Sequence, residues 1–104
     1  MLQAFIPQGD TALITGSTTA TAATQVSTGG AYGMLVTNIT SQLCYVAFGG
    51  STITAAIPSS GTFANGIPFP GGAIQVLNPG PNRYVSIIST AGAPVVTFTP
   101  GEGI

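Results

Sequence analysis

The sequence predicts an all-β fold, either a β-sandwich or a jelly-roll-like arrangement of about eight short antiparallel strands. Three observations support this prediction. Segments rich in β-branched and aromatic residues recur about every 8–12 residues, separated by Gly, Pro, Asn or Ser. Helix formers are scarce, since the chain has no lysine and a single glutamate. The 104 residues suffice for one domain, so we expect a single β-sandwich domain over 1–104.

The predicted strands follow one another along the chain. They cover residues 3–6, 12–15, 21–28, 32–40, 43–48, 52–57, 73–77, 84–89 and 95–99. The weakest is 21–28, which depends on Val26. The residues Asn-Pro-Gly-Pro-Asn at 78–82 predict a hairpin turn, because proline fixes φ and glycine accepts a positive φ.

Alternation along three strands separates an inner face from an outer face. Side chains two residues apart point the same way in a strand. The predicted core contains Val36, Val46, Phe48, Val76, Val85, Ile87, Val96 and Phe98. The strands 43–48 and 84–88 carry sizeable side chains on both faces. We therefore expect a loop or another subunit to cover their outer side.

The longest irregular segment, 58–72, contains three large apolar residues, Phe63, Ile67 and Phe69. A disordered loop would rarely carry them, and connections of this length are commonly functional. Two interpretations remain open. The segment could plug one end of the sandwich, or it could form an apolar contact patch for a partner or a sister subunit.

Charge is nearly absent, because only Asp10, Arg83 and Glu102 carry it and the net charge is −1. Nucleic acid and anionic membranes are therefore not expected as partners. Low net charge favours association between copies. Arg83 is either a solvated residue at a strand end or the partner of a carboxylate, on its own chain or on a neighbour.

The sequence contains no pattern that predicts catalysis. It has no histidine and no lysine, and its two carboxylates lie far apart. General acid–base catalysis and activation of a serine nucleophile need such groups close together. No phosphate-binding loop or metal-ligand spacing is present, so we expect no enzyme activity, no cofactor and no metal. Cys44 is expected to be a small buried hydrophobe, and the glycosylation sequon at 38–40 a chance occurrence.

Targeting signals are also missing from the sequence. No apolar run approaches the roughly 18 residues that span a bilayer. The first residues lack a basic region followed by a long apolar one, so we expect synthesis in a cytoplasm.

Three segments suggest a family. The chain opens on MLQAFIP (1–7), has AFGG at 47–50 and ends on VVTFTPGEGI (95–104). With its Thr-, Ala- and Gly-rich β segments and low charge, it resembles the small capsid decoration (cement or head-stabilising) proteins of tailed bacteriophages. The resemblance implies a β-sandwich or jelly roll that binds the major capsid protein on the outside of the phage head in many copies. It also implies a homotrimer, since threefold sites are common docking points, and it assigns no binding residue.

Two other functions are compatible with the residues. A fibre or tail module that binds a glycan would use clustered aromatics, for which Tyr32, Tyr45 and Tyr84 are candidates. A non-viral adhesion domain would need an export signal. For the leading hypothesis, the predicted interaction residues are Phe63, Ile67, Phe69 and Arg83. Both extended ends, 1–7 and 95–104, are further candidates, as edge strands that add to a neighbour.

Overall fold

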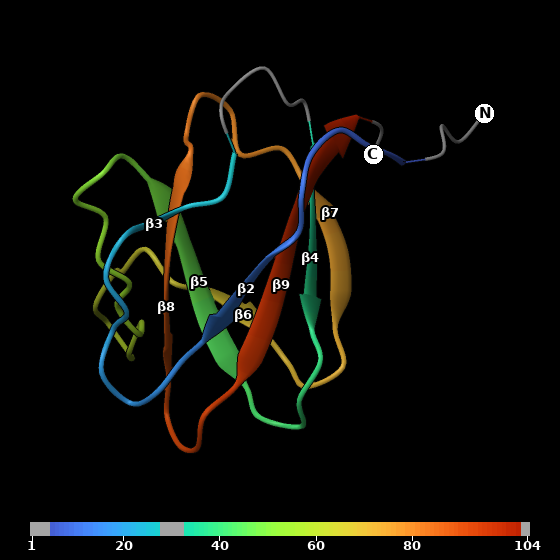
Figure 1. Ribbon diagram of the computed structural model, residues 1–104. Helices are drawn as coiled ribbons and strands as arrows, with labels where there is room; N and C mark the ends of the chain where they lie inside the picture. The colour runs from blue at the N-terminus through green and yellow to red at the C-terminus, as the bar shows by residue number, and fades with distance from the viewer. Residues whose placement is uncertain (1–4, 28–32, 103–104) are drawn as a thin grey trace.

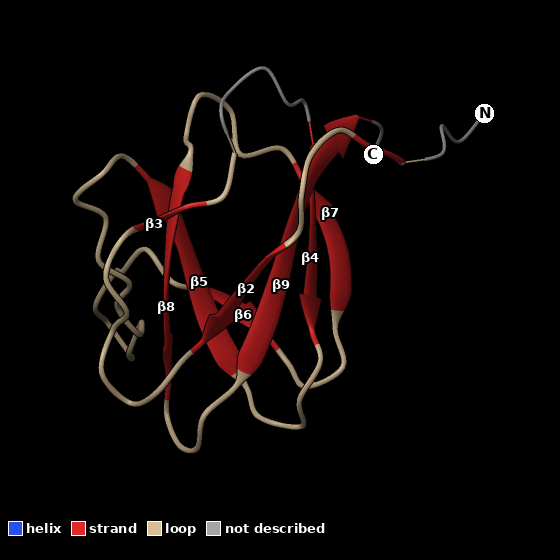
Figure 2. Ribbon diagram, viewed as in Figure 1, coloured by secondary structure: helices blue, strands red, loops and turns tan. Residues whose placement is uncertain are grey.

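A computed structural model describes residues 5–27 and 33–102. These residues form nine strands joined by loops and turns, and Figure 2 shows that they include no helix. The strands are β1 (Ile6–Pro7), β2 (Ala12–Thr15), β3 (Thr24–Gln25), β4 (Gly33–Asn38), β5 (Cys44–Gly49), β6 (Ile67–Phe69), β7 (Ile74–Leu77), β8 (Tyr84–Ser89) and β9 (Val95–Glu102). The prediction of an all-β sandwich is thus confirmed.

The strands form two antiparallel sheets (Figure 1). Sheet A has the order β1-β9-β4-β7, and β2 also pairs with β9 beyond the end of β1. Sheet B has the order β3-β8-β5-β6. The chain crosses between the sheets at every connection except β1 to β2 and β5 to β6.

The pairings are nested. β5 pairs with β6, β4 with β7, β3 with β8, and β2 with β9. The second half of the chain therefore runs back along the first, as one long two-stranded ribbon with residues 50–66 at its tip. Rolling this ribbon adds two further pairings, β4 with β9 and β5 with β8. Apart from the short β1, the strands β2 to β9 thus form two sheets of four strands each, which is the arrangement of a jelly roll.

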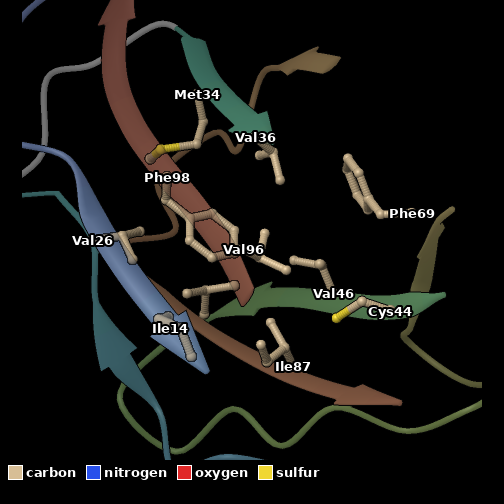
Figure 3. Close-up of a cluster of buried hydrophobic side chains, with 11 residues drawn as sticks. Ile14, Val26, Met34, Val36, Cys44, Val46, Phe69, Ile87, Val96 and Phe98 are labelled. Atoms are coloured by element: carbon tan, nitrogen blue, oxygen red, sulfur yellow. The ribbon is translucent and has the colours of Figure 1, made fainter. Parts of the chain in front are cut away.

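The core fills the space between the sheets (Figure 3). It consists of Ile14, Val26, Met34, Val36, Cys44, Val46, Phe69, Val85, Ile87, Val96 and Phe98. The rings of Phe48 and Phe98 meet edge to face at 6.2 Å between centroids, which joins β5 of one sheet to β9 of the other. Among the predicted core residues, six are fully buried and Phe48 is partly buried against them.

Val76 is the one predicted core residue on the wrong face. It pairs with Leu35, whose neighbours Met34 and Val36 are fully buried and point inward. Leu35 and Val76 therefore point outward, and both are half-exposed. Leu77 takes the inward position on β7 instead.

Asn38, at the end of β4, links the two sheets through hydrogen bonds of its side chain. Its side chain is fully buried and donates to the carbonyl oxygens of Gln42 at 2.7 Å and of Phe69, on β6, at 2.9 Å. Its Oδ1 accepts from the backbone N–H and the hydroxyl of Thr40. Each hydrogen-bonding atom of this buried amide thus has a partner, as burial requires.

Three predicted segments, a strand at 52–57, an irregular stretch at 58–72 and a hairpin turn at 78–82, differ from the structure. The segment 52–57 is a loop and not a strand, because it folds over sheet B and its Ala55 N–H bonds to a side chain. A short strand, β6, lies inside the segment expected to be irregular, and its Pro68 is tolerated because β6 is an edge strand. The turn at 78–82 does form, with φ of 64° at Gly80, but it joins sheet A to sheet B and is not a hairpin.

Candidate interaction surfaces

The outer side of sheet B is covered by the chain itself. Ala47 and Ser86 face each other across β5 and β8, and both are buried on this outer side. The loop 50–66 provides the cover, because the Ala55 N–H donates to Ser86 Oγ at 2.9 Å. The same hydroxyl donates to the carbonyl of Thr21 at 2.7 Å, from the segment that precedes β3. We call this surface the covered face. Of the two covers expected for strands apolar on both sides, a loop or another subunit, the structure shows the loop.

The loop that covers sheet B is held in shape by polar contacts. Asn65 closes its base, because its Oδ1 accepts from the N–H of Ala56 and its Nδ2 donates to the carbonyl of Thr54, both at 2.9 Å. The loop contains a tight turn at 59–62, in which Gly61 has a φ of 76°. Gly66 fits closely against Ala56, since a Cβ there would lie 2.3 Å from the Ala56 carbonyl oxygen.

Phe63 lies directly after this turn, and its side chain is fully exposed. Ile67 lies on the edge strand β6 and is 42% exposed. These two predicted interaction residues are therefore accessible. Phe69 is not: it is 3% exposed and points into the core beside Cys44 and Val36, so its assignment to a surface patch was wrong (Figure 3). Alternation explains the error, since Phe69 pairs with Cys44, which is fully buried.

Arg83 is exposed in the connection between β7 and β8. Its backbone carbonyl accepts from the N–H of Val26 at 2.8 Å, which places it where sheet B ends at β3. The β7–β8 connection and the loop 50–66 follow separate courses in Figure 1. Arg83 and Phe63 are therefore accessible on different connections.

The prediction that the C-terminal segment 95–104 adds to a neighbour as an edge strand is wrong for its described part. β9 is an interior strand of sheet A, with β4 on one side and β1 and β2 on the other. Its backbone hydrogen bonds are used within the chain. Ile6–Pro7 of the N-terminal segment pairs with β9, and residues 1–4 lie outside the described residues.

The two aromatic candidates for a glycan site that lie among the described residues, Tyr45 and Tyr84, do not form a cluster. Tyr45 and Tyr84 both lie on the outer side of sheet B, because Tyr84 pairs with Gly49, four residues beyond Tyr45 on β5. Four residues of strand separate them by about 13 Å. The buried pair Ala47 and Ser86 lies between them. Tyr32 lies outside the described residues.

Among residues 5–27 and 33–102, no segment is seen to cover the outer side of sheet A. Its central row crosses β2, β9, β4 and β7 through directly paired residues, Leu13, Thr97, Thr37 and Ile74. Leu13 is 61% exposed and Ile74 is 66% exposed. We call this surface the open face; it consists of Thr11, Leu13, Thr15, Leu35, Thr37, Ile39, Ile74, Val76, Val95, Thr97 and Thr99. Sequence reasoning missed this surface. The adjacent apolar residues Leu13 and Ile14 were a signal, because neighbouring side chains of a strand point to opposite faces of the sheet.

The open face carries no charged residue and has one internal polar contact. The hydroxyls of Thr11 and Thr99 lie 2.7 Å apart and share a hydrogen bond. Aliphatic side chains and the methyl and hydroxyl groups of Thr15, Thr37 and Thr97 make up the rest of the surface. Such a face can bind another uncharged, flat surface without burying a charge.

The remaining chemistry of the described residues is limited. Burial raises the pKa of the Cys44 thiol from 9.0 to about 11, and a backbone hydrogen bond at Ile88 lowers it by a smaller amount. In this part of the chain, no group of three or more His, Cys, Asp or Glu residues is placed to hold a metal ion. Nor does any helix there have the length and apolarity to cross a bilayer.

Comparisons with protein-family models, with curated proteins and with solved structures find no match to this chain.

Proposed function

We propose that the protein is a non-catalytic structural subunit that decorates and stabilises the outside of a tailed-phage head by binding the major capsid protein in many copies. The observation that carries the proposal is Phe63, a fully exposed aromatic ring on a loop whose shape is fixed by Asn65 and by the turn at Gly61. The ring contributes nothing to the chain's own core. It has the form of an anchor that inserts into a pocket on another protein.

The structure of the loop favours binding. Ordering a loop at the moment of association costs free energy, and a loop that is already ordered avoids most of that cost. Burial of a phenylalanine side chain contributes about 1.5–3 kcal/mol. One such anchor gives weak binding, which suits a protein that attaches to many equivalent sites on a shell and gains from additional contacts along it.

The family resemblance supplies the identity of the partner and of the location. It supports the major capsid protein as the partner, the exterior of the head as the site, and threefold sites as the docking points. The low charge is consistent with dense packing on a shell, because neighbouring copies repel one another little.

The test uses virions of the phage that encodes the chain. Mass spectrometry should find the protein at hundreds of copies per particle, against a few copies for a fibre. Heads stripped of the protein are then incubated with the purified chain or with Phe63→Ser. Loss of the ring should weaken binding by roughly 10- to 100-fold, because each 1.4 kcal/mol is a factor of ten.

Ala64→Ser is the matched control, since Ala64 is exposed on the same loop. It should coat heads like the unchanged chain. Full coating by Phe63→Ser would reject the anchor, and a copy number of a few per particle would reject decoration.

A further inference from the structure

We infer that the open face binds the open face of a second copy of this chain, so that two sandwiches pair across a twofold axis that runs along the strands between β4 and β9. This surface lies on sheet A and is separate from the Phe63 loop, which covers sheet B. The inference therefore stands whether or not the protein binds capsids.

The central row of the open face is complementary to itself. Its order across the sheet is Leu13, Thr97, Thr37, Ile74, with apolar residues at both ends and threonines in the middle. A twofold axis through the middle of the row places β2 over β7 of the copy and β9 over β4 of the copy. Leu13 then lies over Ile74 of the copy, and Ile74 over Leu13 of the copy. Twofold interfaces repeat each contact in this reciprocal way.

The two neighbouring rows fit the same axis. On one side, Val95 of β9 would lie over Ile39 of the copy, which joins two aliphatic side chains. On the other side, Thr99 would lie over Leu35 of the copy. The hydroxyl of Thr99 already bonds to Thr11 within its own chain at 2.7 Å, so this row can be buried without losing that hydrogen bond.

Charge also favours a second copy. The open face contains none of the three charged residues of the chain, so pairing two of these faces juxtaposes no like charges. A partner that recognised this face by charge would find no group to recognise. Two sheets pack face to face at about 10 Å with the side chains of their facing sides between them. Six residues of the open face are aliphatic and five are threonines, so the paired faces would meet through aliphatic side chains and threonines together.

The area of the open face sets the expected affinity between the two copies. Four strands at about 4.8 Å spacing and three rows at about 6.7 Å give a footprint of about 400 Å² per copy before side-chain relief is counted. Stable interfaces bury about 800 Å² per partner. The pair is therefore expected to be weak and reversible, with a dissociation constant in the micromolar range or above, and dimers should form as concentration rises.

The first test is sedimentation equilibrium over a concentration series. The chain should change from monomer to dimer, and Leu13→Lys and Ile74→Lys should each raise the dissociation constant at least tenfold. Both side chains are mostly exposed, so circular dichroism should show an unchanged β fold. Phe63→Lys is the matched control: it places the same charge at an exposed apolar site outside the open face, and it should dimerise normally.

The second test probes the axis by disulfide formation in a Cys44→Ala background. Leu13→Cys and Ile74→Cys should cross-link when the two variants are mixed and oxidised, and much less when either is oxidised alone. A variant oxidised alone should cross-link little, because this axis places the two copies of position 13, and likewise of position 74, three strand spacings apart, about 14 Å, which is too far for a disulfide.

Three results would overturn the inference. The chain could stay monomeric throughout the series. It could form a trimer, which would favour the threefold arrangement implied by the family resemblance. Each cysteine variant could cross-link alone as readily as the mixture, which would exclude this twofold register. None of these results depends on whether Phe63 binds a phage head.

Discussion

The two outer faces of this sandwich both belong to antiparallel sheets, yet the chain covers only one of them with its own loop. Over sheet B, the loop 50–66 lies against Ala47 and Ser86 and bonds to the Ser86 hydroxyl. Over sheet A, Leu13 and Ile74 remain exposed on an uncharged surface. The covered face contains a buried hydroxyl with partners on two segments, whereas the open face contains aliphatic side chains and threonines. Cover by the chain itself depends on hydrogen bonds to one buried hydroxyl, while the face that we assign to a second copy is uncharged and complementary to itself.

A charge placed on each face should give the largest contrast. Ala47→Lys puts an ammonium under the loop, where Ala47 is 1% exposed, and should cost about 3–5 kcal/mol or displace the loop. Thr97→Lys, at the middle of the open face, should change monomer stability by less than about 1 kcal/mol. Urea denaturation of both variants at low protein concentration measures the difference. Equal losses of unfolding free energy in the two variants would mean that the loop does not cover sheet B.

The desolvation of the core between the two sheets can be tested by varying the pH, because the Cys44 thiol points into this core from sheet B. Its ordinary pKa of 9.0 is raised to about 11 in the folded chain, so folding favours the neutral thiol. The resulting stability is present below about pH 9 and is lost as the pH rises through 11. It amounts to about 2–3 kcal/mol.

Cys44→Ala is the comparison for this measurement. It should be less stable at neutral pH because of the cavity, but its stability should fall less between pH 9 and 11. Every other titrating group is present in both proteins, so the difference between their denaturation curves reports the thiol. Parallel curves across that range would show that the thiol is not desolvated.

Removing the hydroxyl that joins the loop to sheet B should have a smaller effect. Ser86→Ala leaves the Ala55 N–H and the Thr21 carbonyl without their partner and should cost about 1–2 kcal/mol. Thr37→Ala on the open face removes a hydroxyl from a half-exposed position and should cost less. Thermal denaturation of the two variants measures the difference between their stabilities. If water replaced Ser86 Oγ at no cost in stability, Ser86→Ala would be as stable as Thr37→Ala.

The smallest effect is expected at the base of the loop. Asn65→Ala removes the bonds to Ala56 and Thr54 at an exposed site, so global stability should fall by no more than about 1 kcal/mol. Hydrogen exchange at the Ala56 amide should nevertheless accelerate, because local opening becomes easier. Unchanged exchange would show that Asn65 does not fix the loop that presents Phe63.

Alternation allowed much of the core to be predicted, because each strand repeats its own inward face. Val46, Val85 and Val96 were assigned correctly for this reason. The same rule failed at 73–77, where Ile74, Val76 and Leu77 allow two alternations and only pairing with β4 selects one. It also failed at 52–57, since Ile53, Ala55 and Ile57 alternate like a strand although their backbone lies over sheet B.

The candidate surfaces were harder to predict than the core. Phe63 and Phe69 belong to one irregular segment in the sequence, and only the pairing of β6 with β5 shows that Phe69 points inward. The open face requires the register of four strands drawn from residues 12 to 99, which no local pattern contains. Threonines at 37 and 97 look like ordinary polar positions until the sheet brings them side by side.

The nested ribbon has a consequence for how the chain folds. The innermost strand pair, β5 with β6, closes over the 50–66 loop, whereas the pairing of β2 with β9 must wait for nearly the whole chain. Loop closure grows more costly with length, and folds dominated by distant contacts form in milliseconds to seconds. A newly made chain therefore has its edge strands β1 and β2 without a partner until its last segment has been synthesised. During that interval the side chains of Leu13 and Ile14 are both in water, and the nascent chain is most vulnerable to aggregation.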